Sequence, residues 1–249
     1  MAGAVSRRER TGRRVTPPRS ERSPRGAARP EGPGDARPRS RAATIAALEA
    51  IQADVAAFRP RGFGPPVHGP PVPSRIFLLG QAPGPHEARF GRPFAWTAGR
   101  TLFRWLERAT GAGEADVRER VYISAVVRCF PGKAPGGGDR LPTPAECARW
   151  RGFVAREVAV LQPRLVIPVG RLAIGEVLGH TEPIAAVVGR TLRTTFHGVE
   201  VDVVPLPHPS GASTWFKMEP GRTLLDRALA LLAAHPAVAR AFAGRGRAA

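Results

Sequence analysis

The sequence of 249 residues lacks any run of 18 apolar residues, and it contains only two cysteines. The missing apolar run excludes a membrane-spanning helix. No apolar segment follows the arginines near the N-terminus, so we expect no secretory signal. Cys129 and Cys147 are too few for a scaffold held by disulfides. These absences favour a cytoplasmic protein without a membrane partner, and we expect a monomer.

Lysine is also scarce, and arginine supplies almost all of the positive charge. The net charge is +18, yet only Lys133 and Lys217 are lysines. Residues 1–41 hold 12 arginines and four acids, and the rest of the chain has 26 basic and 16 acidic residues. A basic tail joined to a basic domain favours a polyanionic partner, most often nucleic acid. The charge alone fits equally well a chain that simply uses arginine heavily.

The composition divides the chain into a folded domain and two tails. Residues 1–41 contain six prolines and almost no large apolar residue, and such a segment cannot bury enough surface to offset chain entropy. We expect a disordered basic tail over 1–41, a folded domain over 42–236 and a basic C-terminal tail over 237–249. A domain of this length can bury one substantial core.

Short β-branched segments alternate with segments of helical periodicity. Apolar residues recur at helical spacing in the segments 43–57, 97–109, 143–161 and 219–234. The predicted strands cover residues 75–79, 121–127, 165–169 and 199–205. Strands that alternate with helices pair in parallel and are covered on both faces. The fold class is therefore α/β, and we expect a three-layer α/β/α sandwich with a central four-stranded parallel sheet.

Glycine- and proline-rich turns follow the first and the last predicted strands. Residues 80–84 are followed by Glu87, and the second turn carries His208. In a parallel sheet both turns lie at the carboxyl edge, where ligands bind in open α/β folds. Phe94, held by a Gly-Arg-Pro turn, is suited to stacking on a flat ligand. Each feature taken alone also has a plain structural interpretation: a turn, a solvated acid or a core phenylalanine.

Several motifs in a fixed order make the chain similar to a known family. It resembles the uracil-DNA glycosylase superfamily, most closely its prokaryotic family 4 and family 5 branches. The resemblance extends over residues 75–234 and depends on these motifs: Gly80-Gln81-Ala82-Pro83-Gly84-x-x-Glu87, Gly91-Arg92-Pro93-Phe94 with Ala98-Gly99-Arg100, residues 126–131, residues 142–147 and His208-Pro209-Ser210.

The resemblance implies a reaction on a nucleotide that is flipped out of the DNA stack. In this family the histidine of the last motif, here His208, stabilises the departing base, and the first loop positions the attacking water. By motif position this second role falls to Glu87, with Gln81 beside it. Phe94 matches the aromatic residue that stacks on the base. Further base-pocket positions match Gly80, Ala82, Pro83, Gly84, Ala125 and Ser210.

The loop after His208 matches the segment that enters the minor groove of DNA. Contacts with DNA are therefore expected from Gly211 and Ala212, and Trp215 or Phe216 is a candidate wedge. Both aromatic residues are equally compatible with a place in the core or in a lid. Lys217 is expected to contact a phosphate and not to form a Schiff base, which favours a monofunctional enzyme. The basic tail and the wedge loop argue against a hydrolase for free nucleosides.

Three departures from the family pattern bear on activity. Gln81 and Ala82 occupy the two positions where the family carries a catalytic acid, which leaves Glu87. Ala125 replaces an asparagine that reads the uracil edge in family 4, so strict uracil specificity is not expected. The family's [4Fe–4S] cluster needs four cysteines, and only Cys129 and Cys147 match. We therefore expect no cofactor and no metal, with His68 as the one alternative ligand.

These observations predict a DNA-repair glycosylase that removes uracil or a related deaminated base and leaves an abasic site. The alternatives are a glycosylase for another lesion, such as hypoxanthine, and a catalytically weak module that binds DNA lesions on the same fold.

Overall fold

The computed structural model describes residues 39–180, 182–211 and 213–243, so most of the predicted N-terminal tail lies outside the described residues. In chain order the elements are α1 (Arg41–Ala57), β1 (Ile76–Gly80), α2 (Glu87–Phe90), α3 (Thr97–Thr110), α4 (Glu114–Arg120), β2 (Tyr122–Ala125), α5 (Pro144–Leu161), β3 (Leu165–Pro168), α6 (Arg171–Leu178), α7 (Ile184–Val187), β4 (Leu192–Phe196), β5 (Val199–Val203), the 3-10 helix η1 (Trp215–Lys217), α8 (Gly221–Ala234) and α9 (Pro236–Ala241).

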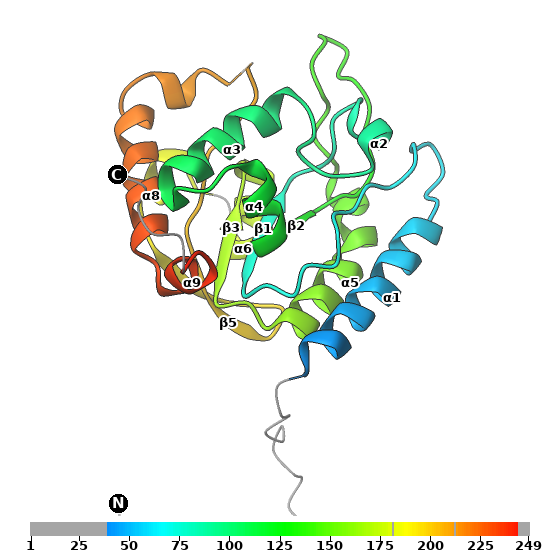
Figure 1. The fold of residues 1–249 in the computed structure, drawn as a ribbon. Helices are drawn as coiled ribbons and strands as arrows, with labels where there is room; N and C mark the ends of the chain where they lie inside the picture. The colour runs from blue at the N-terminus through cyan, green and yellow to red at the C-terminus, as the bar shows by residue number, and fades with distance from the viewer. Residues whose placement is uncertain (1–38, 181, 212, 244–249) are drawn as a thin grey trace, which may run out of the picture. The chain divides into compact units, whose positions relative to one another are not determined.

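The described residues form one mixed five-stranded sheet in the order β2-β1-β3-β5-β4 (Figure 1). Strands β2, β1, β3 and β5 run parallel, and β4 pairs antiparallel with β5. The α/β class is confirmed, but the prediction of a purely parallel four-stranded sheet was wrong. The additional strand β4 lies at the edge of the sheet.

The sequence hides β4 because its hairpin turn carries an uncommon residue pair. His197 and Gly198 both have positive φ, 47° and 80°, and together they form the two-residue connection between β4 and β5. The usual pairs at such turns are Asn-Gly and Asp-Gly, whereas a histidine with positive φ is uncommon. In addition, β4 alternates exposed and partly buried residues, so it lacks the continuous apolar run of the central strands.

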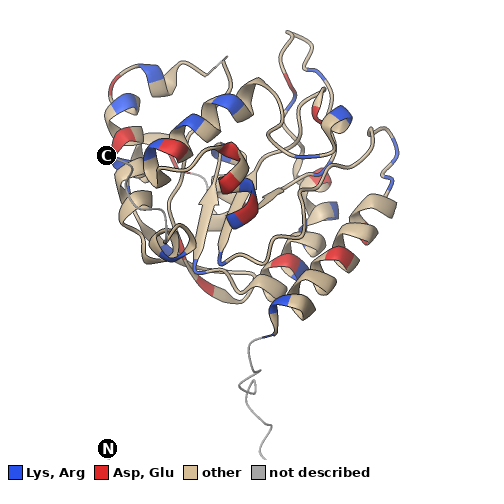
Figure 2. Ribbon diagram, viewed as in Figure 1, with Lys and Arg blue, Asp and Glu red and all other residues tan. Residues whose placement is uncertain are grey.

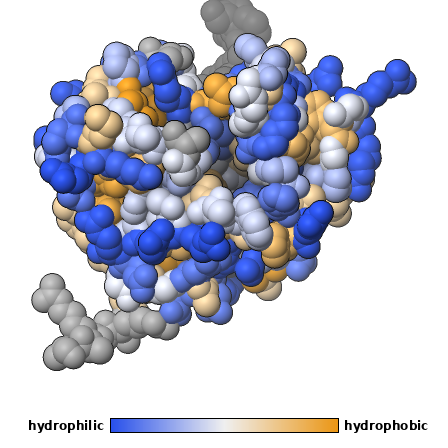
Figure 3. All heavy atoms as spheres, turned by 90° about the horizontal axis from the view of Figure 1, so that it is seen from above, coloured by the Kyte–Doolittle hydropathy of each residue, from blue (hydrophilic) through white to orange (hydrophobic). Residues whose placement is uncertain are grey.

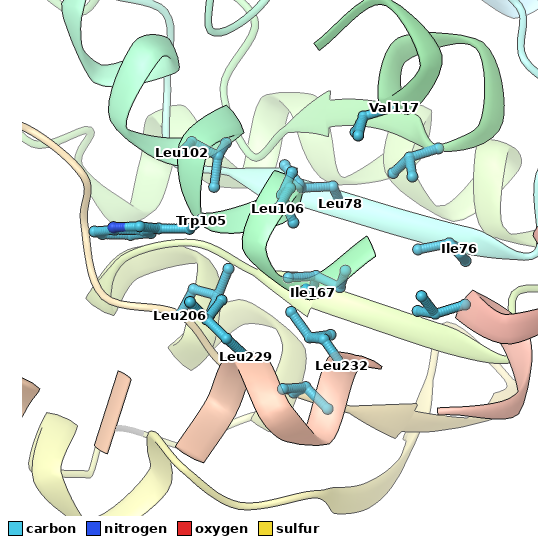
Figure 4. Close-up of a cluster of buried hydrophobic side chains, with 14 of the residues drawn as sticks. Ile76, Leu78, Leu102, Trp105, Leu106, Val117, Ile167, Leu206, Leu229 and Leu232 are labelled. Carbon is cyan, nitrogen blue, oxygen red and sulfur yellow. The ribbon is translucent and has the colours of Figure 1, made fainter. Parts of the chain in front are cut away.

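Helices cover both faces of the sheet and give three layers. On one face, Ile76 and Leu78 pack against apolar side chains of α3, α4, α8 and α9 (Figure 4). On the other face, Phe77 and Leu79 pack against α1, α5 and α6. Alternate residues of β1 thus point into two separate cores, as the period of a strand requires. Every residue of β1 is buried.

Both ends of the folded part differ from the predicted boundaries. Helix α1 begins at Arg41, and the Ser40 hydroxyl accepts a hydrogen bond from the Ala43 amide at 3.2 Å. The C-terminal tail predicted from residue 237 was wrong, because α9 buries Ala237 and Val238 in the core. Pro236 begins this helix, and proline is favoured at a first helical position.

The parallel register aligns the ends of four strands at one edge of the sheet. Gly80 lies beside Ala125, and the Gly80 carbonyl accepts a hydrogen bond from the Val126 amide at 2.9 Å. On the other side, the Gly170 amide donates to the Leu206 carbonyl at 2.9 Å. The predicted loops therefore meet at this edge.

In the described part of the chain, no helix is long and apolar enough to span a bilayer.

Candidate active site

Phe94 lies against Gly80, at the end of β1. A Cβ atom on Gly80 would approach the Phe94 ring to 2.7 Å at Cζ and 2.9 Å at Cε2, which is closer than real contacts allow. The residue at position 80 must therefore lack a side chain if the ring is to occupy this place. Since Ala125 pairs with Gly80, the structure brings these three predicted site residues together.

The backbone of Phe94 is held by Arg118 of α4, which sequence reasoning missed. Phe94 has a φ of 55°, which is uncommon for a residue with a side chain. The buried Arg118 donates to the Pro93 carbonyl at 3.0 Å and to the Phe94 carbonyl at 2.9 Å. Gly99 leaves room for the same carbonyl, because a Cβ there would lie 1.8 Å from the Phe94 oxygen. This short helix was not predicted, so no signal pointed to Arg118.

Gln81 and His208 meet at Gly170, although 127 residues separate them in the sequence. A Cβ on Gly170 would lie 2.8 Å from the Gln81 side-chain oxygen and 3.0 Å from Cδ2 of His208. Gly170 also has a φ of 89°, a conformation that favours glycine. The Gln81 oxygen accepts a hydrogen bond from the Leu172 amide at 3.0 Å, in the first turn of α6. This bond leaves the Gln81 amide hydrogens as donors.

His208 is arranged as a neutral hydrogen-bond donor. Its Nδ1 atom accepts from the Ser210 amide at 3.3 Å, so the proton of the neutral ring lies on Nε2. Burial lowers the pKa of His208 below its ordinary value, while the charge of Asp139 opposes that shift. The imidazole is therefore neutral at physiological pH, with one N–H group to offer. Ser210 thus joins the site as the residue that selects the tautomer.

Asp139 is a second residue that sequence reasoning missed. It lies in the loop between β2 and α5, where its carboxylate pairs with Lys133 at 2.7 Å. The other carboxylate oxygen is 3.9 Å from the position of a Cβ on Gly84, in the first loop. Asp139 also acts on the pKa of His208. The loop is rich in glycine and proline, and its sequence alone gave no reason to place its single acid at the site.

Glu87 is buried, with 6% of its surface exposed, and is not a solvated loop acid. Its Oε2 atom accepts from the Gly84 amide at 3.2 Å, within the first loop. Burial raises the pKa of Glu87 to about 7, although backbone amides of Gly84, Ala95 and Phe94 favour the ionised form. The carboxyl group thus links the first loop to the segment that carries Phe94. It can gain or lose a proton near neutral pH.

The raised pKa of Glu87 predicts a pH-dependent stability. Between pH 4.5 and about 7 the unfolded chain ionises this group while the folded chain keeps the proton, so rising pH weakens the fold. Relative to Glu87→Gln, the wild type should lose free energy of unfolding on the order of 3 kcal/mol over that window. Urea unfolding of both proteins from pH 4.5 to 8 measures the difference. A difference that stays constant across this range would contradict the assignment.

The residues after His208 are positioned in different ways. Phe216 packs edge-on against Trp105, with ring centroids 4.9 Å apart, and Trp215 is partly buried against the same core. Gly211 and Lys217 are exposed, and Ala212 lies outside the described residues. Both wedge candidates are therefore half-buried against the core. The contacts with DNA assigned to Gly211, Ala212, Trp215 and Lys217 stay predictions.

The exposed aromatic side chains lie elsewhere, on the segment between Glu87 and α3. Phe90 is 46% exposed and Trp96 is 44% exposed, and their rings stack with centroids 5.7 Å apart. The His86 ring lies 5.0 Å from Trp96. Figure 3 shows the molecule from above, and hydrophobic patches alternate with hydrophilic side chains on that face. Arg89 and Arg92 are exposed on the same segment, and Arg100 is exposed in the first turn of α3.

The residues present do not fit a four-ligand metal cluster. Cys129 and Cys147 are buried free thiols, and burial raises the pKa of each to about 11, which disfavours the thiolate that binds metal. Both cysteines lie in an apolar core that also holds Trp150 and Phe58, whose rings pack edge-on with centroids 4.8 Å apart. His68 is hydrogen-bonded to the neighbouring Gly69 carbonyl. Among the described residues, no three His, Cys, Asp or Glu side chains form a group that could hold a metal ion.

Comparison with known proteins agrees with the sequence motifs. A model of the uracil DNA glycosylase superfamily matches residues 66–233. Three curated relatives are each named type-4 uracil-DNA glycosylase. The one from Pyrobaculum aerophilum is 30% identical over 139 residues, which is 54% of this chain and 66% of the relative. The one from Thermotoga maritima is 32% identical over 133 residues (50% and 64%), and the one from Sulfurisphaera tokodaii is 27% identical over 143 residues (56% and 61%). The matches thus cover less than two thirds of each relative.

Proposed function

The chain belongs to the uracil-DNA glycosylase superfamily, and from this premise we propose that it hydrolyses the N-glycosidic bond of uracil or a related deaminated base in DNA. The relatives with which it shares motifs are named type-4 uracil-DNA glycosylase. The observation that carries the proposal is the neutral imidazole of His208, which meets Gln81 at Gly170 on the carboxyl edge of the sheet. The product is an abasic site.

The mechanism follows from where charge develops. As the bond to the sugar breaks, the base leaves as an anion and the sugar becomes cationic. The Nε2–H group of His208 donates to the carbonyl oxygen of the leaving base, and such a donor is most effective when it is already oriented. Phe94, held over Gly80, stacks on the flipped base. Ala125 lies beside this position and offers no polar group to distinguish uracil from other bases.

Few carboxylates lie where the attacking water is expected, and their positions differ from those of the family's catalytic acids. Gln81 cannot accept a proton, so its amide is assigned to orienting the substrate or the water. Glu87 holds the loop and has a pKa of about 7, which suits a proton acceptor at neutral pH. Asp139 adds negative charge near Gly84 and His208, where it would favour a cationic sugar. Stabilisation of the leaving group is therefore assigned the larger share of the rate enhancement.

One experiment separates this proposal from its alternatives. The full chain is incubated with duplexes that contain a single uracil, hypoxanthine or xanthine, and alkali then cleaves any abasic strand. Cleavage of the uracil duplex supports the proposal, and cleavage of the hypoxanthine duplex alone would change the substrate. No cleavage of any duplex, together with salt-sensitive DNA binding, would favour a lesion-binding module.

We infer that the enzyme works without an iron–sulfur cluster. Two cysteines among 249 residues cannot supply the four thiolates of such a cluster, and both lie in an apolar core. Purified protein is expected to contain no iron at stoichiometric level, and an absorbance band typical of iron–sulfur clusters would overturn this inference. The monomeric state and the cytoplasmic location stay predictions.

Gly170→Ala tests whether the meeting of Gln81 and His208 matters for excision. The added Cβ would displace one or both side chains, so we expect the single-turnover rate to fall by at least about tenfold. Gly179→Ala is the matched control, because Gly179 has a similar φ of 75° and nothing lies near its Cβ position. Equal rates for the two variants would show that backbone strain alone explains the loss.

The stacked pair Phe90 and Trp96 is proposed as a contact for an unpaired base beside the lesion. Aromatic stacking on a base contributes about 1–3 kcal/mol, so Trp96→Ala should weaken binding to single-stranded DNA by roughly five- to 150-fold. The control is Leu141→Ala, which removes an exposed apolar side chain without a ring. Fluorescence anisotropy with a labelled oligonucleotide measures both. If Leu141→Ala and Trp96→Ala weaken binding equally, the stacking assignment fails.

A further inference from the structure

A group of charged residues lies at the edge of the sheet opposite the candidate active site, where β1 and β3 begin. A cavity of about 340 Å³ there is lined by five arginines and a single acid, Glu119. This volume is in the range of small-molecule sites. In Figure 2, basic residues mark the lower ends of these strands. The five arginines come from separate elements of the fold: Arg41, Arg75, Arg120, Arg164 and Arg240.

The positive charge of the cavity is poorly compensated. Among the described residues, Arg41, Arg75, Arg164 and Arg240 form no ion pair with a carboxylate, and Arg120 reaches Asp116 only at 3.6 Å. Some arginines on other surfaces are paired: Arg108 lies 2.7 Å from Asp226, Arg151 lies 3.0 Å from Glu176 and Arg156 lies 2.6 Å from Asp54. What distinguishes this place is that five arginines from separate elements line one cavity beside a single acid.

The electrostatics of the cavity favour a bound anion. The pKa of Arg75 is lowered first by burial and then by the charge of Arg164. Like charges held together in a partly buried place repel each other, and a bound anion would relieve that repulsion.

We propose that this cavity binds phosphoryl groups, at a site separate from the candidate active site. Guanidinium groups match phosphate oxygens with paired hydrogen bonds, and several of them can surround one polyphosphate. Val72, Pro73 and Ile76 add an apolar wall, which suits a ligand with a non-polar part. The five residues of β1 separate the two edges by about 16 Å, so the bound anion does not contact the reacting nucleotide.

Phosphoryl groups can come from a free polyphosphate or from the backbone of nucleic acid. Isothermal titration of the full chain therefore uses pyrophosphate, ATP and a lesion-free oligonucleotide at constant ionic strength. The test variant is Arg164→Gln with Arg240→Gln. The control, Arg108→Gln with Arg151→Gln, removes the same charge from paired arginines.

The proposal expects the dissociation constant for pyrophosphate to rise at least about tenfold in the test variant and less than about twofold in the control. A loss confined to the oligonucleotide would identify nucleic acid as the source of the phosphates. Equal affinities of the two variants for all three probes would overturn the proposal. Arg41→Gln gives a second test if the double variant melts at a lower temperature. Uracil excision by the test variant is measured in low salt as well. This assay separates failure of the anion-binding proposal from failure of the proposed glycosylase activity.

Discussion

His208→Ala is expected to lower the single-turnover rate of uracil release by about 100- to 1,000-fold. Loss of one oriented donor to a developing anion has a cost of this size in other enzymes. We propose the Nε2–H of His208 as such a donor, because Ser210 occupies Nδ1 and burial keeps the ring neutral. Quenched-flow or manual sampling with excess enzyme measures the rate directly, free of product release.

Two companion variants make the result specific. His180→Ala removes an exposed histidine that lies beside Glu182, and it should leave the rate unchanged. His208→Gln keeps an amide donor and should recover part of the rate. Because the pKa of His208 is lowered, wild-type activity should not fall as pH rises from 7 to 8 through loss of an imidazolium. If His208→Ala excises uracil as fast as the wild type, the leaving-group role is wrong.

The second large effect concerns a buried charge network that supports β2. Glu157 is fully buried and accepts hydrogen bonds from Tyr122 at 2.8 Å, from Ser124 at 3.0 Å and from Arg128 at 2.6 Å. Glu157→Ala would leave the guanidinium of Arg128 buried without its partner. We expect the free energy of unfolding to fall by about 3–5 kcal/mol. Urea unfolding followed by circular dichroism measures the change.

Two controls separate the buried charge from simple loss of contacts. Asp226→Ala breaks the exposed pair with Arg108 and should change stability by less than about 1 kcal/mol. Glu157→Leu combined with Arg128→Met replaces the pair by apolar side chains and should recover most of the loss. A double variant as unstable as Glu157→Ala would show that packing, and not the unpaired charge, sets the cost.

The sequence was sufficient for what depends on local pattern. The start of α5 is marked in the sequence by Thr143, Pro144 and an acid, Glu146, and in the structure Thr143 and Glu146 form both hydrogen bonds of a capping box. The central strands were visible because they are short apolar runs that end in glycine or proline. Since parallel strands end at the same edge, the meeting of the first and last loops could also be foreseen, and Gln81 and His208 do meet there.

What the sequence could not reveal depends on contacts between distant residues. Arg118 is 24 residues from Phe94 and lies on a helix with few apolar residues, so nothing local marks its two hydrogen bonds to carbonyls. Asp139 gains its position only because a flexible-looking loop folds back over Gly84. The pKa of Glu87 follows from burial, which a loop sequence does not disclose. The arginine cavity likewise gathers residues that span 200 positions of the chain.

The central claim is that the full chain breaks the bond between deoxyribose and uracil while leaving the DNA strand intact. Chromatography of the free base released from a duplex with one uracil, with enzyme in excess, measures this step alone. We expect one equivalent of free uracil per duplex and a strand that breaks only after alkali. Binding of the duplex without release of any free base would contradict it.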